Sequence, residues 1–419
     1  MAKHHWLNRK KLLSPRNLAH LLICLALVYL CYIFGLFTHL LERDLNDFKY
    51  PLEVDIRIAI DNLKQHNQLL ADGPSDRFIL ADDESLSSLD VNKLNYTFLF
   101  NPERKCRTGE PPLLVILVKS KYSNFRYREA IRKTWGQASP LTRTFFLVGL
   151  PAYADLNSMD AQVVDEANRP ANKRRLLSPI EHYHLVLSLS RDSNKVNHFN
   201  KYLNNKYSSD ERSVFLQLDD EQRQHGDLIQ QNFHDTYFNN TLKTLMGLKW
   251  VNNYCSNAKY YLFIDDDYFL NPSLLVNDLI GRRLKSSPSS LDTLYAGYVF
   301  ADSAPMRHIL SKWYVPLDEY PYSRYPPYVS AGCYLMSVQS VRLFYMASKL
   351  IELFRLDDIY MGILAHKLDV KPVHVDNIHF YAPKYSPELF ANSVIAAHQF
   401  EPDKLEEIWR DIGTKLSIS

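Results

Sequence analysis

The pattern of apolar and polar positions begins with one long apolar run near the N-terminus. Residues 18–41 read LAHLLICLALVYLCYIFGLFTHLL, with only His20, Gly35, Thr38 and His39 breaking the run. At 1.5 Å per residue, a helix over these positions is roughly 36 Å long, which is enough to cross a bilayer with some tilt. The run therefore predicts a transmembrane segment over residues 18–41.

Charged residues flank this run asymmetrically. Basic residues precede it and acidic residues follow it: Lys3, Arg9, Lys10, Lys11 and Arg16, then Glu42, Asp44 and Asp47. A basic flank stays in the cytoplasm, so residues 1–17 form a cytoplasmic tail and the rest of the chain enters the lumen. A cleaved signal peptide would have a shorter apolar region ending at small residues, whereas this run ends at Leu40-Leu41-Glu42. A buried core helix is the other alternative. We favour the signal anchor of a single-pass type II membrane protein.

The segments that follow change from polar to regularly apolar. Residues 42–110 are polar and acidic, as in DGPSD at 72–76 and DDESLSS at 82–88, and we interpret them as a lumenal stem. LLVILV at 113–118 then predicts a strand buried on both faces, residues 127–135 a helix and TFFLVGL at 144–150 a second buried strand. This strand–helix–strand order predicts a parallel sheet in an α/β domain.

A polar stretch interrupts this pattern at residues 151–212, and we interpret it as a surface insertion with a possible helix at 179–191. Its basic cluster KRR at 173–175 is either a solvated loop or a contact for an acidic partner. Regular signals resume at 214–221, followed by a helix expected from about Asp227 through Tyr254. Further strands are expected at 260–264, 294–300 and 334–338. The simplest interpretation is one catalytic domain over residues 111–419.

Composition adds three constraints. The formal net charge of +2 over 419 residues argues against a nucleic-acid-binding protein. Asn95 and Asn239 begin glycosylation sequons, which are modified only in the secretory lumen. The three cysteines beyond the apolar run, Cys106, Cys255 and Cys333, allow one disulfide of unspecified pairing, and no C-x-x-C spacing supports a zinc site.

Three consecutive aspartates, Asp265, Asp266 and Asp267, directly follow the predicted strand at 260–264. Alternate side chains of an extended segment point the same way, so Asp265 and Asp267 are expected to converge at the carboxyl end of the strand, where open α/β sheets bind ligands. Carboxylates suit Mn²⁺ or Mg²⁺, which share their ligands with substrate phosphates. A plain solvated turn is the alternative, but the apolar segments on both sides favour a ligand site.

A second acidic pair, Asp357 and Asp358, lies at the start of a helix predicted by the apolar spacing of Ile359, Ile363 and Leu364. The free backbone N–H groups of a helix start stabilise a carboxylate, which explains one of the two. The other is a candidate general base for an acceptor hydroxyl.

These motifs together resemble glycosyltransferase family 31, whose members are inverting β-1,3-glycosyltransferases with a GT-A fold. The resemblance covers most of residues 113–410 and is carried by RYREAIRKTWG (126–136), HGDLIQQNFHDTYFNNTLKT (225–244), KYYLFIDDDYFLN (259–271), KWYVPLDEYPYSRYPPYVSAGCYLMS (312–337) and LDDIYMG (356–362). Three stretches are most similar to the brainiac-like branch, which adds N-acetylglucosamine to glycolipids: FNNTLKT, FRLDD and SVIAAHQFEP (393–402). Other near relatives are galactosyltransferases.

The resemblance implies a role for each matching residue. Asp265, Asp266 and Asp267 match the metal-and-nucleotide motif, with Asp267 as the direct ligand, and His398 matches a histidine that completes the metal site. Asp358 matches the proposed base. Arg128 and Arg132, four apart on one helix face, match a cationic pair suited to a nucleotide diphosphate. Trp313, Tyr328 and Gly332 match positions that shape the sugar and acceptor pocket.

The sequence thus predicts a Golgi membrane enzyme that transfers galactose or N-acetylglucosamine from a UDP-sugar, with N-acetylgalactosamine as a less favoured alternative. The expected acceptor is a 3-hydroxyl of a glycolipid or glycoprotein glycan, and the expected cofactor is Mn²⁺ or Mg²⁺. One alternative is an inactive, lectin-like lumenal protein of the same fold. Another is a metal-dependent hydrolase that uses the same aspartates.

Overall fold

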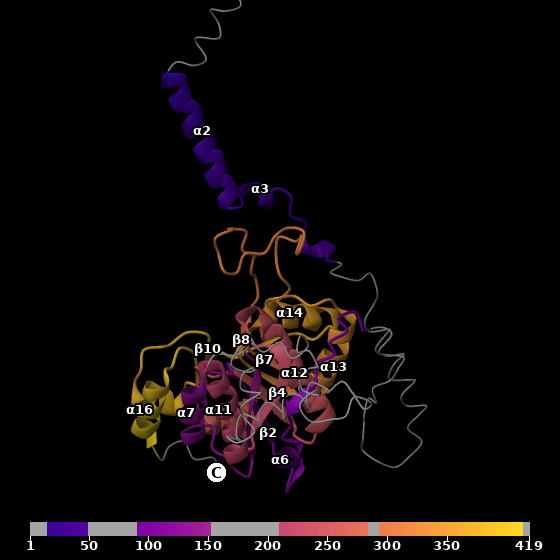
Figure 1. Cartoon of the computed structure of the whole chain (residues 1–419), viewed down its shortest axis with the longest axis vertical. Coiled ribbons are helices and arrows are strands. Elements are labelled where there is room, and N and C mark those ends of the chain that lie inside the picture. Colours follow the sequence, from indigo (N-terminus) through magenta and orange to yellow (C-terminus); the bar gives the residue numbers. More distant parts are fainter. Residues whose placement is uncertain (1–14, 49–89, 152–208, 284–292, 414–419) are drawn as a thin grey trace, which may run out of the picture. The chain divides into compact units, whose positions relative to one another are not determined.

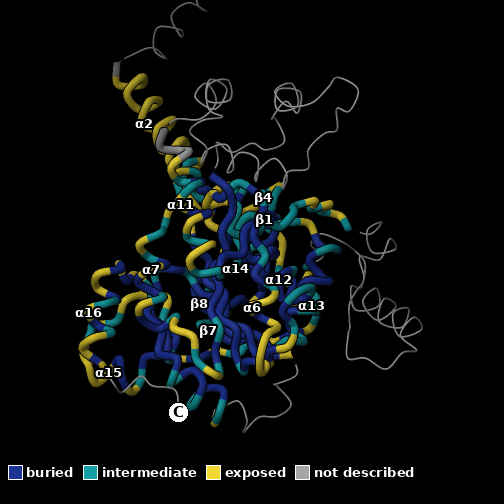
Figure 2. Tube along the Cα trace, turned by 60° about the horizontal axis from the view of Figure 1, so that its bottom comes forward, coloured by how far each residue is buried: buried dark blue, intermediate teal, exposed yellow. Residues whose placement is uncertain are grey.

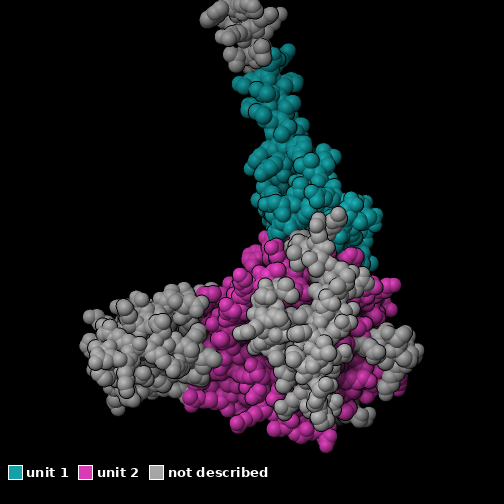
Figure 3. Space-filling view, turned by 90° about the vertical axis from the view of Figure 1, so that its right-hand side faces the viewer, with its two compact units in different colours: residues 1–50, 301–327 teal, residues 51–300, 328–419 magenta. Residues whose placement is uncertain are grey.

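A computed structural model of the chain describes residues 15–48, 90–151, 209–283 and 293–413. The chain divides into two compact units, coloured separately in Figure 3: unit 1 contains residues 1–50 and 301–327, and unit 2 contains residues 51–300 and 328–419. Most of the predicted stem and of the predicted insertion, including the cluster at 173–175 and the helix at 179–191, lies outside the described residues.

Unit 2 is built on a mixed eight-stranded sheet. The strand order is β1 (Phe98–Phe100), β4 (Leu228–His234), β3 (Thr142–Leu150), β2 (Leu114–Lys119), β5 (Tyr260–Asp265), β8 (Tyr328–Ser337), β7 (Tyr295–Phe300) and β9 (Val373–His374). Strands β4, β3, β2 and β5 run parallel, while β8 is antiparallel to both β5 and β7. The central strands are the predicted apolar runs, because helices cover the sheet on both faces.

Helices flank this sheet on two sides (Figure 1). One group contains α7 (Phe125–Lys133), α11 (Ser209–His225) and α16 (Pro402–Ile412), and the other contains α12 (Asn240–Tyr254), α13 (Val338–Leu350) and α14 (Asp357–Lys367). The buried strands and inner helix faces form the dark core in Figure 2. Alternate β2 residues Leu114, Ile116 and Val118 share this core with Ala130 and Ile131 of α7. Each such aliphatic side chain contributes roughly 1.5–3 kcal/mol by leaving water. The predicted α/β class is confirmed, consistent with a GT-A-like domain behind an N-terminal apolar helix.

The helix predicted from about Asp227 through Tyr254 is wrong in its first half. The chain leaves α11 at Gly226, whose φ of 59° is left-handed, and continues as strand β4 before the short helix η3 (Tyr237–Asn239) and then α12. Strand β4 is hard to recognise in the sequence because two glutamines occupy it. Both are buried, and Gln230 donates from Nε2 to the Gly149 carbonyl at 3.1 Å, so the sheet gives the amide nitrogen a partner at a position that the pattern placed in a helix.

A second, three-stranded sheet ties the end of the chain to the acidic turn. Its order is β10 (Ile378–His379), β11 (Ala396–Ala397) and β6 (Phe269–Leu270). Strand β11 pairs antiparallel with β6, and the Phe400 N–H donates to the Asp267 carbonyl at 2.8 Å. This pairing brings residue 398 beside residue 267.

The remaining short elements of unit 2 are α6 (Glu103–Arg107), the π-helix η4 (Leu274–Arg283) and α15 (Pro387–Asn392). A disulfide joins Cys106 of α6 to Cys255 at the end of α12, with Cα atoms 5.7 Å apart. Cys333 is buried in β8 as a free thiol. The pairing that the sequence left open is therefore Cys106–Cys255.

Unit 1 contains the apolar N-terminal helix α2 (Pro15–Ile33), followed by α3 (Leu36–His39) and η1 (Leu45–Asp47). Helix α2 has the length and composition of a membrane-crossing helix over Arg16–Ile33. It is shorter than the predicted span of 18–41, because Gly35 adopts a left-handed φ of 72° and lies against Arg307. Arg307 is itself buried, and its Nε donates to Glu42 at 2.7 Å.

Candidate active site

Lys119 connects the two acidic motifs of unit 2. It is the last residue of β2, and in the parallel pairing with β5 it lies opposite Asp265. Its side chain is 3% exposed, and its Nζ lies 3.1 Å from both Asp265 Oδ1 and Asp357 Oδ2 and 2.8 Å from the Ala331 carbonyl. Burial by itself lowers the pKa of Lys119, but the two carboxylates outweigh it and raise the pKa above its ordinary value.

The prediction from sequence missed Lys119. The available signal was its position at the end of an apolar strand, next to the strand that ends in three aspartates. Parallel neighbours finish at the same edge of a sheet, so a terminal lysine on one strand meets a terminal aspartate on the next.

The two aspartates at the start of α14 have different surroundings. Asp357 Oδ2 is bound by Lys119 and lies 3.4 Å from Thr244 Oγ1 of α12. Asp358 accepts a hydrogen bond from the Ile359 N–H at 2.8 Å, and no side chain of the described residues bonds it. Burial, with the charge of Asp357, raises the pKa of Asp358 to about 7. Asp357 is held in place, whereas Asp358 is able to accept a proton near neutral pH.

Asp267 and His398 form a close pair at the turn after β5. His398 Nε2 lies 3.0 Å from Asp267 Oδ2, and both side chains are about one third exposed, at 31% and 36%. The His398 Nδ1 is 3.2 Å from the Phe380 carbonyl, to which it donates when it carries the proton, which directs Nε2 toward Asp267. Although burial lowers the pKa of His398, Asp267 raises it above its ordinary value.

Tyr268 fixes the orientation of this imidazole. Its ring stacks on His398 with centroids 4.9 Å apart, and its backbone carbonyl accepts a hydrogen bond from Trp135 Nε1 at 3.0 Å. Gly332 of β8 faces the same ring, since an added Cβ there would stand 2.7 Å from Tyr268 Cε2. Gly332 therefore supports the His398 side chain through Tyr268.

Asp265 lies between these two groups of residues. Its side chain is 34% exposed and bonded to Lys119. Burial of the carboxyl raises its pKa to about 6 against the opposing charge of Lys119. The next residue, Asp266, is buried, and its Oδ2 accepts from Ser120 Oγ at 2.7 Å and Asn124 Nδ2 at 2.9 Å. This oxygen of Asp266 therefore holds the β2–α7 loop, and the role of Asp266 in nucleotide binding stays a prediction.

Arg128, which the resemblance assigns to the diphosphate, lies inside the protein. Its guanidinium is fully buried, and all five N–H donors have partners within the protein: both carboxylate oxygens of Glu221, Ser120 Oγ, and the carbonyls of Lys121 and Tyr122. Arg128 instead orients Ser120, which holds Asp266.

Arg132 is also engaged within the protein. It donates to both oxygens of Asp227, at 2.8 and 2.9 Å, and pairs with Glu221 at 2.7 Å. Its guanidinium also covers the ring of Phe146 at 4.5 Å. The predicted cationic pair is thus neutralised by Glu221 and Asp227, neither of which the sequence analysis singled out.

The remaining predicted pocket residues divide between the two units. Tyr328 begins β8 and stacks on Phe300, with ring centroids 5.2 Å apart. Trp313 belongs to unit 1, is 47% exposed and has the Lys312 ammonium over its ring at 4.4 Å.

The side chains near the acidic turn limit which kind of metal site can form there. Among the described residues, no three His, Cys, Asp or Glu side chains converge on a common metal position. Asp267 and His398 offer one carboxylate and one imidazole in adjacent positions, while Asp265 is paired with Lys119. Such a pair fits a hard divalent cation that takes its other ligands from a diphosphate and water, and it does not fit a closed, four-ligand structural site.

Comparison with known proteins adds to this geometry. A family model described as galactosyltransferase matches residues 207–376. The Drosophila melanogaster β-1,3-galactosyltransferase brn is 32% identical over 392 residues, covering 93% of this chain and 94% of that protein. The chain belongs to the galactosyltransferase family, glycosyltransferase family 31.

Other members of this galactosyltransferase family are similar over most of the chain. Human β-1,3-galactosyltransferase 1 is 30% identical over 332 residues, covering 78% of this chain and 82% of that protein. Human β-1,3-galactosyltransferase 2 is 29% identical over 329 residues, covering 77% and 63%. The relatives support a β-1,3-glycosyltransferase.

Proposed function

We propose that this chain is an inverting β-1,3-hexosyltransferase that moves galactose or N-acetylglucosamine from a UDP-sugar to a 3-hydroxyl of a glycolipid or glycoprotein glycan. The observation that carries the proposal is the environment of Asp358. It is a carboxylate with a raised pKa that no side chain of the described residues bonds, and it is adjacent to an aspartate that is fixed by Lys119. A general base requires these properties.

The reaction is a single displacement. Asp358 takes the proton of the acceptor 3-hydroxyl, and that oxygen forms a bond to the anomeric carbon of the donor. The bond between this carbon and the diphosphate oxygen breaks on the opposite face, and UDP leaves. A single displacement inverts an α-linked donor, so the product carries a β linkage.

Asp267 and His398 are the residues that would hold Mn²⁺ or Mg²⁺ in this mechanism. Their 3.0 Å separation, and the Nδ1 contact that directs Nε2 toward Asp267, support this assignment. When bound, the metal supplies positive charge that stabilises the departing diphosphate.

Lys119 acts as a positioning residue. Through Asp265 and Asp357 it joins the turn that precedes Asp267 to the helix start that carries Asp358. A buried, bonded ammonium fixes these two segments relative to one another, which keeps the base aligned with the donor.

We place this activity in the Golgi lumen, with the chain anchored by α2 as a type II protein. The length and composition of α2 and the basic residues before it support this orientation. The lumenal disulfide between Cys106 and Cys255 is consistent with an oxidising compartment.

The test is UDP release by the detergent-solubilised full chain, measured across a panel of UDP-sugars and acceptors, with Mn²⁺ and after chelation. Release that requires one UDP-sugar, an acceptor and the metal supports the proposal and names the donor. Glycan binding without release under any combination would overturn it in favour of a lectin-like protein. Release of free sugar without an acceptor would indicate a hydrolase.

A further inference from the structure

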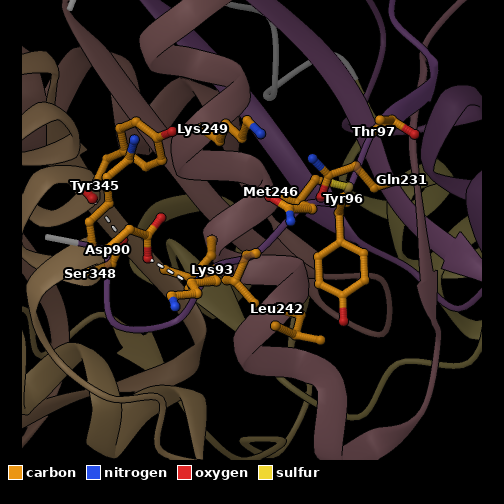
Figure 4. A pocket seen from close by; sticks show the side chains of 14 residues that line it. Asp90, Lys93, Tyr96, Thr97, Gln231, Leu242, Met246, Lys249, Tyr345 and Ser348 are labelled. Carbon is orange, nitrogen blue, oxygen red and sulfur yellow. Dashed lines mark hydrogen bonds between the residues drawn. The ribbon is translucent and has the colours of Figure 1, made fainter. Parts of the chain in front are cut away.

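A pocket lies in unit 2, and none of the residues assigned above to catalysis lines it. It has a volume of about 640 Å³ and is formed by residues 90–97, Gln231 of β4 and parts of α12 and α13 (Figure 4). This volume is within the range of small-ligand sites. Helix α12 separates the pocket from the acidic cluster: Thr244 faces Asp357, while Leu242, Leu245 and Met246 line the pocket.

The wall formed by residues 90–97 is fixed to the rest of unit 2. Asn92 donates from Nδ2 to the Ser348 and Ile351 carbonyls at 2.7 and 2.8 Å, and its Oδ1 accepts from the Leu353 N–H at 3.1 Å. Farther along, the Thr97 N–H donates to Asn232 Oδ1 at 2.7 Å. The pocket wall is therefore preformed.

The lining chemistry matches a saccharide. Figure 4 shows Tyr345 toward one end and Tyr96 toward the other, with Lys93 and Leu242 between them. The Tyr96 ring can pack against a sugar C–H face, while lysine ammonium groups and Gln231 donate to hydroxyl and acetamide oxygens. Tyr345 is 9% exposed and has the Lys349 ammonium 5.3 Å from its ring centroid, so it serves as a wall of the pocket. Asp90 is the one carboxylate of the lining, and its Oδ1 already accepts the N–H groups of Asn92 and Lys93.

Asn95 is the feature that identifies the saccharide. It lies in the pocket wall, its side chain is exposed, and it begins the sequon Asn95-Tyr96-Thr97. Asn239, which begins the second sequon, donates from Nδ2 to the His234 carbonyl at 2.7 Å and lines no part of this pocket. We propose that the first N-acetylglucosamine residues of an N-linked glycan on Asn95 occupy the pocket and hold residues 90–97 against α12 and α13.

The inference rests on the lumenal orientation proposed above. There, a lipid diphosphate-linked oligosaccharide donates the glycan. A bond forms between Asn95 Nδ2 and the anomeric carbon, the bond from that carbon to the lipid diphosphate breaks, and the amide loses one proton.

The covalent bond to Asn95 allows a neutral sugar to occupy the pocket even if its affinity for the pocket is modest. A tethered ligand has an effective concentration in the millimolar range or above, so a pocket that binds the free sugar weakly is occupied by the attached one. If this concentration exceeds the dissociation constant tenfold, the equilibrium population of the open segment falls by about tenfold.

The test uses the full chain made in cells with a secretory pathway. Glycopeptide mass spectrometry measures occupancy of both sequons, and hydrogen–deuterium exchange measures protection of residues 90–97, α12 and α13. We expect Asn95 to carry a glycan, and Asn95→Gln to lower protection of residues 90–97 by about tenfold. The matched control, Asn239→Gln, leaves that protection unchanged.

A second variant tests the pocket with the glycan still in place. Lys249→Ala combined with Lys349→Ala keeps Asn95 glycosylated and lowers the same protection. Unchanged exchange in both the Asn95 and the lysine variants would overturn the proposal. A glycan on Asn239 alone would overturn it while leaving the lumenal orientation intact. No glycan on either sequon would also overturn it, and it would remove the support that the sequons give to that orientation.

Discussion

The charged residues around the ends of β2 and β5 form two groups that differ in how fully their polar atoms are used. The first, which we call the saturated network, contains Arg128, Glu221, Ser120 and Asp266. Here all five donors of Arg128 have partners and the guanidinium is fully buried. The second, the open group, contains Asp358, Asp267 and His398. Asp358 has no side-chain partner among the described residues, and the Asp267–His398 pair is about one third exposed.

This difference separates structural from chemical roles. A buried ion pair whose donors are all used holds its neighbours in place, and it has no capacity left for a ligand. A carboxylate with spare acceptor capacity and a raised pKa is available to a substrate. Residue type and motif membership do not distinguish the two groups, since Asp266 and Asp267 are neighbours in the same aspartate motif but belong to different groups.

The largest effect is expected for Asp358→Asn. The amide keeps the shape but cannot take a proton, so transfer falls by about 10²–10⁴-fold. Initial rates of UDP release measure the loss, and UDP-sugar binding measured by calorimetry stays near wild type. Retained transfer would remove Asp358 from the role of base.

Arg128→Met tests the saturated network. Removing one partner of a buried ion pair leaves Glu221 without its main cation, so we expect a stability loss of about 3–5 kcal/mol. Denaturant unfolding measures this loss. If the variant keeps its stability but binds UDP-sugar more weakly, the result would support the predicted contact between Arg128 and the diphosphate.

His398→Ala tests the open group at the opposite end of the site. Loss of the imidazole is expected to weaken Mn²⁺-dependent UDP-sugar binding by at least about 10–100-fold. Titration of the nucleotide at several Mn²⁺ concentrations measures the shift. His379→Ala is a control, because His379 lies in β10 of the same small sheet. Equal binding by both variants would argue against His398 as a ligand.

The smallest effect is a pH dependence that comes from the same open group. The pKa of Asp358 is raised to about 7, and the base acts in its deprotonated form. Transfer is therefore low when the pH is below 7, rises by about tenfold per pH unit toward 7 and levels off above it. Rates from pH 5 to 9 check this limb, which should be missing from the residual activity of Asp358→Asn.

Local sequence determined the elements with the clearest apolar pattern. Strands β2, β3 and β5, helix α7 and the start of α14 all follow from runs or spacings that are buried as expected. Burial of apolar side chains acts over a few residues, so its periodicity is visible in the chain itself. The family motifs also located the acidic turn and the aspartate pair.

Tertiary structure decided which polar residues are bonded within the protein and which remain available to a substrate or metal. Arg128 appears in a motif like any cationic ligand, but Glu221, 93 residues away, neutralises it. Lys119 becomes a link between two acidic motifs only because β2 lies beside β5. Strand β4 has a polar sequence, and its Gln230 Nε2 finds a partner only in the carbonyl of the neighbouring strand β3. Hydrogen bonds and ion pairs join residues far apart in the chain, so no local pattern shows whether a polar group already has its partner.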